Sequence, residues 1–284
     1  MQLTSSACQC VYFDGFGHLS NGTFLSPNYP VPYDSDIPCI LYTFIGGEEE
    51  IVELRFQYFQ LQLPEKDGNC LDYVRTFQEL DDEYVNEYTR WQQTFCGCQA
   101  PPSFSLFSVG PSLVFEFHSD SYRSPYDIGF LGTFHFRRKK DYMTDGLKLP
   151  STECDYYIKS EDDRKRGKFF SPRYPYNIPS KSKCNYWFSG KANELVRVTI
   201  VKLNFGRITG SCSSSDSRIT VFDGKGPQWL HSEDSGSIVM LGVFCKDFGH
   251  NETVVSSESN LYVEFISGEV MKNETVRIVG VLNI

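Results

Sequence analysis

The pentapeptide SPNYP at positions 26–30 returns as SPRYP at positions 171–175, and this repetition decides how the chain is organised. Each proline fixes the backbone angle φ and lacks an amide N–H, and it pushes the residue before it toward an extended conformation. The pentapeptide is therefore typical of a turn between strands. Further landmarks return in the same order about 142 to 149 residues later, which indicates two homologous modules. These landmarks are Cys39 and Cys184, GNCLDYVRTF at 68–77 and GSCSSSDSRITVF at 210–222, and LVFEF at 113–117 and LYVEF at 261–265.

Alternation of apolar and polar residues predicts half-buried strands at 51–56, 112–119 and 195–203. Aromatic residues, which favour strands, make up 15% of the chain. Turn signals such as Asp67-Gly68 and Asp223-Gly224 separate the expected strands. Many short strands in each module predict an all-β fold made of two tandem antiparallel β-sandwiches.

The two modules have the usual size of domains, and we expect them at residues 8–137 and 154–284. The polar segment 138–153 is expected to be a linker or a junction packed between them. The best helical candidate, LDDEYVNEYTRW at 80–91, is short and lies between two cysteines. We expect it to form an irregular excursion containing one turn.

The chain has ten cysteines, and an even number in a strand-rich sequence predicts disulfides and an oxidising, extracellular compartment. Three glycosylation sequons agree with this prediction, at Asn21, Asn251 and Asn273. The start MQLTSSAC lacks the charged and apolar regions of a signal peptide, so we expect a mature chain or a fragment of a longer one. The sequence contains no run of 18 apolar residues, so it predicts no membrane-spanning helix.

The charge and the histidines argue against two classes of function. The net charge is −9, whereas nucleic-acid binding requires a basic surface. Acidic residues flank the basic clusters 137–140 and 164–166, so we interpret both clusters as solvated linker and loop charges. None of the five histidines forms an HExxH pattern, and no G-x-S-x-G or P-loop motif is present. We therefore expect no enzyme and no catalytic residue.

Each module resembles a CUB domain. The shared pattern is a Cys, G-x-F-x-SP-x-YP, a second Cys, an I-x-L-x-F strand, a Cys followed by an Asp, F-Cys, L-x-x-EF and a closing strand. The resemblance implies a two-sheet β-sandwich of an extracellular protein with two disulfides in each module. The implied disulfides are Cys10–Cys39, Cys70–Cys96, Cys154–Cys184 and Cys212–Cys245.

Two cysteines, Cys8 and Cys98, are left over by this scheme. We expect either that they pair with each other or that Cys8 takes the place of Cys10. Spacing alone does not decide between these alternatives.

The resemblance also implies a calcium site in the first module, because many CUB domains bind this ion through a Tyr, a Glu and two Asp. Tyr33, Asp72 and Asp120 fall on that pattern, but Gln62 stands where the family has the Glu. Loss of one carboxylate should weaken the site, and turn hydrogen bonds are the alternative role for these carboxylates. No site is expected in the second module, where the matching positions are Ile178, Gly206, Asp216 or Ser217, and Gly268.

A narrower resemblance concerns the suppressor-of-lurcher proteins. It rests on CQCVYFDGFG at 8–17, NCLDYV at 69–74 and VNEYTRW at 85–91, and it continues through DGLKLP at 145–150 into the second module. It implies an auxiliary subunit that binds an AMPA-type ionotropic glutamate receptor ectodomain and modulates its gating, with other auxiliary subunits as further partners. Such a protein would act at the extracellular face of the plasma membrane, at synapses, held by the receptor or by an anchor outside this chain. The alternative is a secreted matrix or protease-associated CUB adaptor of the procollagen-processing or complement type.

Two loops are candidate partner-binding sites, because protein interfaces favour Tyr, Trp and Arg. For the first loop, the alternative role is to cover the open end of the sandwich. The first loop contains Tyr84, Tyr88, Arg90 and Trp91, and the second contains Tyr122, Arg123 and Tyr126.

Overall fold

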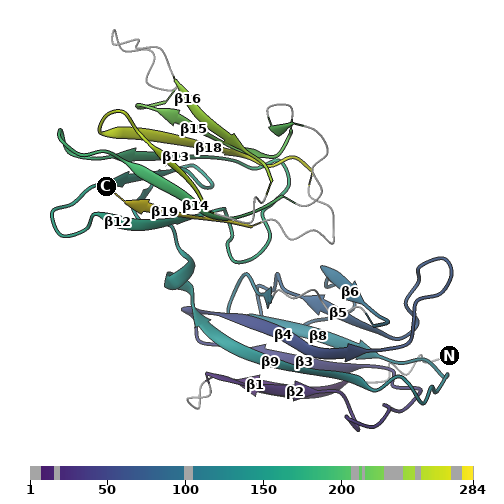
Figure 1. Ribbon diagram of the computed structural model, residues 1–284. Helices are drawn as coiled ribbons and strands as arrows, with labels where there is room; N and C mark the ends of the chain where they lie inside the picture. The colour runs from purple at the N-terminus through teal and green to yellow at the C-terminus, as the bar shows by residue number, and fades with distance from the viewer. Residues whose placement is uncertain are drawn as a thin grey trace. The chain divides into compact units, whose positions relative to one another are not determined.

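The structure is a computed structural model with two compact units, Met1–Asp141 and Tyr142–Ile284 (Figure 1). Each unit is a β-sandwich with two disulfides, as the sequence predicts. One strand pair in each unit is parallel, and the other strand pairs are antiparallel. The structure describes residues 8–15, 20–98, 105–205, 211–212, 215–226, 239–246, 251–269 and 277–283.

The first unit packs a five-stranded sheet, ordered β1-β3-β8-β5-β6, on a four-stranded sheet, ordered β2-β9-β4-β7. Alternating side chains from both sheets meet in an aromatic core, in which the Phe24 ring contacts those of Phe44, Phe56 and Phe115. The strands are β1 (Gln9–Asp14), β2 (Asn21–Leu25), β3 (Ile40–Ile45), β4 (Glu50–Gln60), β5 (Tyr73–Phe77), β6 (Gln93–Phe95), β7 (Leu106–Phe107), β8 (Ser112–His118) and β9 (Gly129–Arg138).

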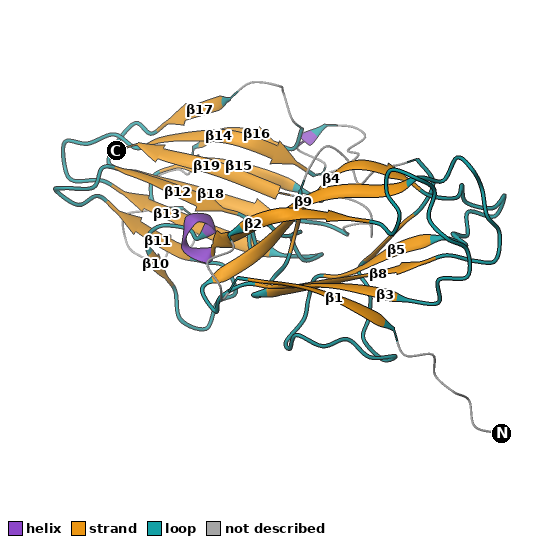
Figure 2. Ribbon diagram, turned by 90° about the horizontal axis from the view of Figure 1, so that it is seen from below, coloured by secondary structure: helices purple, strands orange, loops and turns teal. Residues whose placement is uncertain are grey.

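The second unit repeats this plan (Figure 2), and its described residues contain one more strand than those of the first unit. Its sheets are ordered β10-β11-β13-β18-β15-β16 and β12-β19-β14-β17. The strands are β10 (Leu147–Lys148), β11 (Tyr156–Lys159), β12 (Arg166–Phe170), β13 (Lys183–Ser189), β14 (Arg197–Asn204), β15 (Arg218–Asp223), β16 (Met240–Phe244), β17 (Glu252–Val255), β18 (Asn260–Ile266) and β19 (Arg277–Asn283).

The repeated pentapeptide forms the same turn in both units. A buried tyrosine fixes the residue before each copy: the Tyr42 hydroxyl donates to the Leu25 carbonyl at 2.9 Å, and the Tyr186 hydroxyl donates to the Phe170 carbonyl at 2.7 Å. Both turns also contain a cis Tyr-Pro peptide bond. These shared contacts explain why the pentapeptide marks the two modules.

Most of the segment predicted as a linker belongs to the second unit. After a short 3-10 helix (Lys139–Tyr142), the Asp145 N–H donates to the Lys168 carbonyl, and the Lys168 N–H donates back to the Asp145 carboxylate. Strand β10 then pairs with β11. The predicted excursion at 80–91 is irregular, with a turn closed by the Thr89 N–H on the Asn86 carbonyl.

One predicted disulfide of the first unit is wrong. The structure joins Cys8, not Cys10, to Cys39, because Gln9 lies opposite Ile40 and Cys10 lies opposite Leu41 in the β1–β3 pair. Cys10 and Cys98 are exposed free thiols. The alternative Cys8–Cys98 pair is also wrong, because β1 and β6, the strands beside these cysteines, form opposite edges of the five-stranded sheet.

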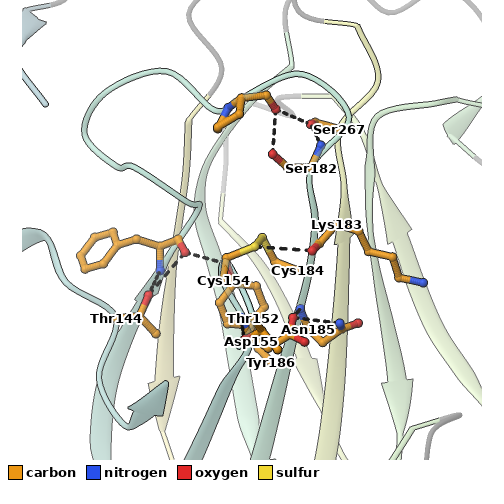
Figure 3. Close-up of a disulfide and its surroundings, with 12 residues drawn as sticks. Thr144, Thr152, Cys154, Asp155, Ser182, Lys183, Cys184, Asn185, Tyr186 and Ser267 are labelled. Carbon is orange, nitrogen blue, oxygen red and sulfur yellow. Dashed lines mark hydrogen bonds between the residues drawn. A yellow bond between two sulfur atoms is a disulfide. The ribbon is translucent and has the colours of Figure 1, made fainter. Parts of the chain in front are cut away.

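The other three implied disulfides are present, at Cys70–Cys96, Cys154–Cys184 and Cys212–Cys245. Figure 3 shows Cys154–Cys184 beside Asp155, whose carboxylate accepts hydrogen bonds from the backbone and side-chain nitrogens of Asn185. This network holds the start of β11 against β13.

Candidate functional site

The residues suggested for calcium converge at one end of the first unit. The Tyr33 hydroxyl donates to one oxygen of Asp72 at 2.5 Å, and the backbone N–H of Asp120 donates to the other at 2.7 Å. The Gln62 N–H donates to the Tyr33 hydroxyl at 3.2 Å. These residues come from four separate segments of the chain, and their hydrogen bonds bring them together.

Burial dominates the electrostatics of this cluster. It raises the pKa of Asp72, although hydrogen bonds from Tyr33 and Asp120 favour the ionised form. Burial and the Asp72 carboxylate also raise the pKa of Tyr33, which therefore stays a hydrogen-bond donor at neutral pH. Asp127, which the sequence analysis missed, is a further member: burial, and to a smaller extent the Asp72 charge, raise its pKa. Its only sequence signal was its place next to Tyr126 in a candidate loop.

As they stand, these side chains do not fit a calcium ion. Calcium takes six to eight oxygen ligands, whereas both oxygens of Asp72 already accept hydrogen bonds from the protein. The Gln62 Oε1 atom is buried without a partner, at the position where a carboxylate would be needed. Across the described ranges, no group of three or more His, Cys, Asp or Glu side chains is placed to hold a metal ion.

The matching positions of the second unit are filled by other contacts. Ile178 is buried in the core, and the Gly268 N–H donates to the Ser217 hydroxyl at 2.9 Å. Gly206 lies outside the described residues. Asp216 lies close to Gly268: a Cβ atom added to Gly268 would lie 2.9 Å from the Asp216 side chain.

An aromatic and cationic stack lies over β5 and β8 on the outer face of the five-stranded sheet of the first unit. The Arg75 guanidinium lies 3.9 Å from the Tyr73 ring centre and 4.3 Å from that of Trp91. Tyr73 in turn stacks on His118, with ring centres 4.9 Å apart, and donates to Glu116. We call Trp91, Arg75, Tyr73 and His118 the aromatic stack. Sequence reasoning missed Tyr73 and Arg75, although their spacing of two along β5 placed them on one face.

The first candidate loop joins this stack. Trp91 is 49% exposed, and Tyr84 and Tyr88 are 77% and 82% exposed. The loop returns to the sheet through the Gln92 N–H, which donates to the Thr76 carbonyl at 2.8 Å. Arg90 is exposed. Two tyrosines are therefore largely exposed on a loop whose end is fixed to the sheet.

The second candidate loop lies beside the acidic cluster. The Tyr122 N–H donates to the Asp120 carboxylate at 2.7 Å, and Arg123 forms an exposed ion pair of 3.5 Å with Asp34. The rings of Tyr122 and Tyr126 are mostly exposed. Both candidate loops therefore present aromatic rings to solvent.

The remaining predicted features lie at the surface. Asn21 and Asn251 are exposed and open to modification, and Asn273 lies outside the described residues. The basic clusters pair with acids: Arg137 with Glu53 at 2.7 Å and Lys165 with Glu194 at 2.6 Å are examples. No helix in the described part is long and apolar enough to cross a membrane.

Comparison with known proteins identifies both units. The family model described as "CUB domain" matches residues 14–130 and 154–278. Human cubilin is 25% identical over 258 residues, which cover 88% of this chain and 6% of cubilin. Mouse tolloid-like protein 2 is 23% identical over 279 residues, covering 89% of this chain and 25% of that protein. Mouse procollagen C-endopeptidase enhancer 2 is 33% identical over 122 residues, covering 42% of this chain and 27% of that protein.

The chain therefore spans only a small part of the length of these relatives. The matched segments are CUB domains, and no catalytic domain is matched in this chain. CUB domains are extracellular modules that bind other proteins, which agrees with the disulfides and the exposed aromatic rings. Both units belong to the CUB domain family, and the chain is an extracellular, disulfide-bonded tandem CUB protein.

Proposed function

We propose that this chain is the non-catalytic, partner-binding part of a secreted matrix or protease-associated protein. The observation that carries the proposal is the aromatic stack with its neighbours Tyr84 and Tyr88, which exposes large rings on a supported surface. The names of two relatives agree with this class, since one is a tolloid-like protein and another is an enhancer of a procollagen C-endopeptidase. The surface that contacts the partner protein lies on the first unit.

The stack suits a protein partner for physical reasons. Trp, Tyr and Arg contribute most of the binding energy of many interfaces, because large rings bury much apolar area with little loss of side-chain entropy. Arg75 is held between two rings before any partner arrives, so binding need not order it. Its Nε atom is buried and lacks a hydrogen-bond partner. A partner that covers Trp91 would therefore meet a rigid anchor.

A second candidate function is an auxiliary subunit of an ionotropic glutamate receptor. The sequence motifs at 8–17 and 85–91 favour it. Such a subunit would act by binding one gating state of the receptor more tightly than another. We rank it second, because the names of two of the relatives reported above agree with the first class.

Quantitative affinity capture of the intact protein, from culture medium and from detergent-solubilised membranes, tests both functions. We expect proteases of the procollagen-processing or complement type, or their matrix substrates, to be recovered with the wild-type protein. Trp91→Ala should reduce this recovery about 10-fold, because truncation of an interface anchor costs at least 1 to 2 kcal/mol. Leu195→Ala, an exposed apolar residue of the second unit, is the matched control and should change nothing.

Stoichiometric recovery of a glutamate receptor would replace the first function by the second. Recovery that Trp91→Ala leaves intact would remove the aromatic stack as the contact surface. Failure to recover any partner from either source would contradict both functions.

A further inference from the structure

The six-stranded sheet of the second unit carries a row of aromatic side chains on its outer face. One residue comes from each of the neighbouring strands β11, β13, β18 and β15 (Figure 1). Their registers align Tyr157, Trp187, Tyr262 and Phe222 across the sheet, and aligned residues share a face. None of the four belongs to the core cluster between the sheets, whereas Tyr186, the neighbour of Trp187 on β13, does. We call these four residues the aromatic row.

The first unit shows that the fold does not require large rings at the centre of this row. Trp187 lies opposite Tyr262 in the β13–β18 pair, and the matching β3–β8 pair places Thr43 opposite Val114. Thr43 and Trp187 match because each follows the buried tyrosine whose hydroxyl anchors the pentapeptide of its unit. The same sheet is thus built with much smaller side chains in the first unit. The two rings of the second unit therefore suit a role other than folding.

A pocket lies beside the aromatic row, where β13 ends and β18 begins. It encloses about 330 Å³, which is at the lower end of the range of small-ligand sites. Tyr157 and Trp187 from the row, and Ser189, Lys225 and Asn260, are among the residues that line it. None of the described lining residues is acidic. The pocket therefore combines aromatic walls with a single cation.

The turn after β15 holds Lys225 at this pocket. The Gly224 N–H donates to the Asn260 carbonyl at 3.1 Å. Gly226 has φ +81°, and a Cβ atom added to it would lie 2.5 Å from the Tyr262 ring. The turn thus packs directly on the aromatic row, and Lys225 between these two glycines is exposed. Its ammonium group is placed to meet an anionic ligand.

The polar groups of the pocket indicate what this ligand must offer. Trp187 is only 6% exposed, and its indole Nε1 atom is buried without a hydrogen-bond partner. An indole nitrogen can only donate, and a buried donor without an acceptor is unfavourable. The side chains of Ser189 and Asn260 can both donate and accept, as the hydroxyl groups of a sugar do. These groups together suit a ligand with an anionic group, several hydroxyls and an apolar face.

We propose that this pocket binds a carboxylated monosaccharide of a glycan chain, either a hexuronic acid or a sialic acid. Lys225 pairs with the carboxylate, which also accepts a hydrogen bond from the Trp187 indole. Ser189 and Asn260 bind sugar hydroxyls, and the apolar face of the ring lies on Tyr157. An aromatic acid would fit the walls but would leave Ser189 and Asn260 without partners, which is why a sugar is favoured. An extracellular protein meets such sugars on matrix polysaccharides and on glycoproteins.

Isothermal titration calorimetry of the full disulfide-bonded chain tests the site. The probes are the methyl glycosides of glucuronic acid and of N-acetylneuraminic acid, and methyl glucoside is the neutral control. We expect one acidic sugar to bind with a Kd of about 1 mM, as its small size allows, and the neutral sugar to bind at least 10-fold more weakly. Glucuronic acid would identify a matrix polysaccharide as the source of the ligand, and N-acetylneuraminic acid a glycoprotein.

A pair of lysine variants tests the cation. Lys225→Met should weaken binding of the acidic sugar about 10-fold, because it removes the charge-assisted hydrogen bond. Lys202→Met is the matched control, since it makes the same change at an exposed position of β14 in the other sheet, and it should leave binding unchanged. Both lysines are exposed, so neither change removes a buried contact.

A third variant tests the buried donor. Trp187→Phe keeps an aromatic ring but removes the indole N–H, and it should weaken binding severalfold. The melting temperature of each variant without sugar checks that it is folded. Wild-type protein that binds neither acidic sugar, or that binds methyl glucoside equally well, would overturn the proposal. Binding that Lys225→Met leaves intact would also overturn it, and unchanged binding by Trp187→Phe would remove the indole from the site.

Discussion

Glu53 is a buried carboxylate whose charge the first unit balances with two arginines. It accepts hydrogen bonds from the Ser105 hydroxyl and from Arg137 Nε, and Arg55 lies 3.4 Å away. Burial by itself would raise the pKa of Glu53, but these hydrogen bonds and charges outweigh burial and hold the pKa below its usual value. Glu53 thereby ties β4 to β9 near the end of the unit.

This arrangement predicts a loss of stability in acid. Because the pKa of Glu53 is lower in the folded state than in the unfolded chain, its contribution is complete above about pH 4.5 and is lost as the pH falls through the folded-state value. Glu53→Gln should cost about 2 kcal/mol at neutral pH and should flatten the acid dependence. Urea unfolding at pH 7, 5 and 3 measures both effects. The exposed Glu48→Gln is the control, and an undiminished acid dependence in Glu53→Gln would contradict the assignment.

Gln62 is the residue that separates the acidic cluster from a calcium site. We expect calcium at millimolar concentration to leave the melting temperature of the wild-type protein unchanged, because a ligand stabilises only the state that binds it. Gln62→Glu supplies the missing carboxylate and should gain about 1 to 3 kcal/mol with calcium. Gln57→Glu, which adds the same charge at an exposed position of β4, should gain nothing. Equal calcium stabilisation of wild type and Gln62→Glu would refute this account.

At the scale of elements, the turn formed by the pentapeptide requires a glycine on β9. The Phe130 N–H donates to the Ser26 hydroxyl, and the Ser26 N–H donates to the Phe130 carbonyl. Gly129 has φ +97°, and a Cβ added there would overlap the Ser26 hydroxyl. The first residue of the pentapeptide and the first residue of β9 are therefore fitted to each other.

The close approach predicts a difference between two glycines. Gly68 also has positive φ, but nothing lies within 4 Å of an added Cβ. Gly68→Ala should cost about 1 kcal/mol through backbone strain alone. Gly129→Ala should cost about 2 kcal/mol more, because Ser26 must move. Chemical denaturation of the two variants measures both losses of unfolding free energy. Equal losses would show that Ser26 can move away from an added Cβ without cost.

At the scale of the whole molecule, the two units have separate cores. The buried clusters centred on Phe24 and Phe115, and on Tyr186 and Phe265, share no residue. Each unit also closes its own two disulfides. Each unit therefore has what an independently folding domain needs.

The boundary between the units is testable with two fragments. The fragment 142–284 keeps β10 and the hydrogen bonds of Thr144 and Asp145 to β12, whereas 154–284 loses them. We expect 154–284 to be less stable by about 2 kcal/mol, since each lost hydrogen bond costs about 1 kcal/mol. Thermal unfolding of both fragments under oxidising conditions measures this. Equal stability would mean that residues 142–153 behave as a linker.

Local chemistry in the sequence determined the fold class. Period-two alternation predicts strands because side chains alternate across a sheet. The proline-rich turn is likewise a local signal, because its conformation is set within five residues. The repeat of SPNYP as SPRYP and the ten cysteines then gave two disulfide-bonded β-sandwiches. Tyr33, Asp72 and Asp120 were singled out differently, by the resemblance of the first module to CUB domains that bind calcium.

Only the tertiary structure decided which residues meet across strands. The register of β1 on β3 chose Cys8 over Cys10 as the partner of Cys39. The return of the 80–91 excursion placed Trp91 over Arg75. Strand β10 extends one sheet of the second unit by pairing with β11, and the described residues of the first unit contain no matching strand. Local sequence cannot fix these outcomes, because register and edge pairing depend on contacts between segments far apart in the chain.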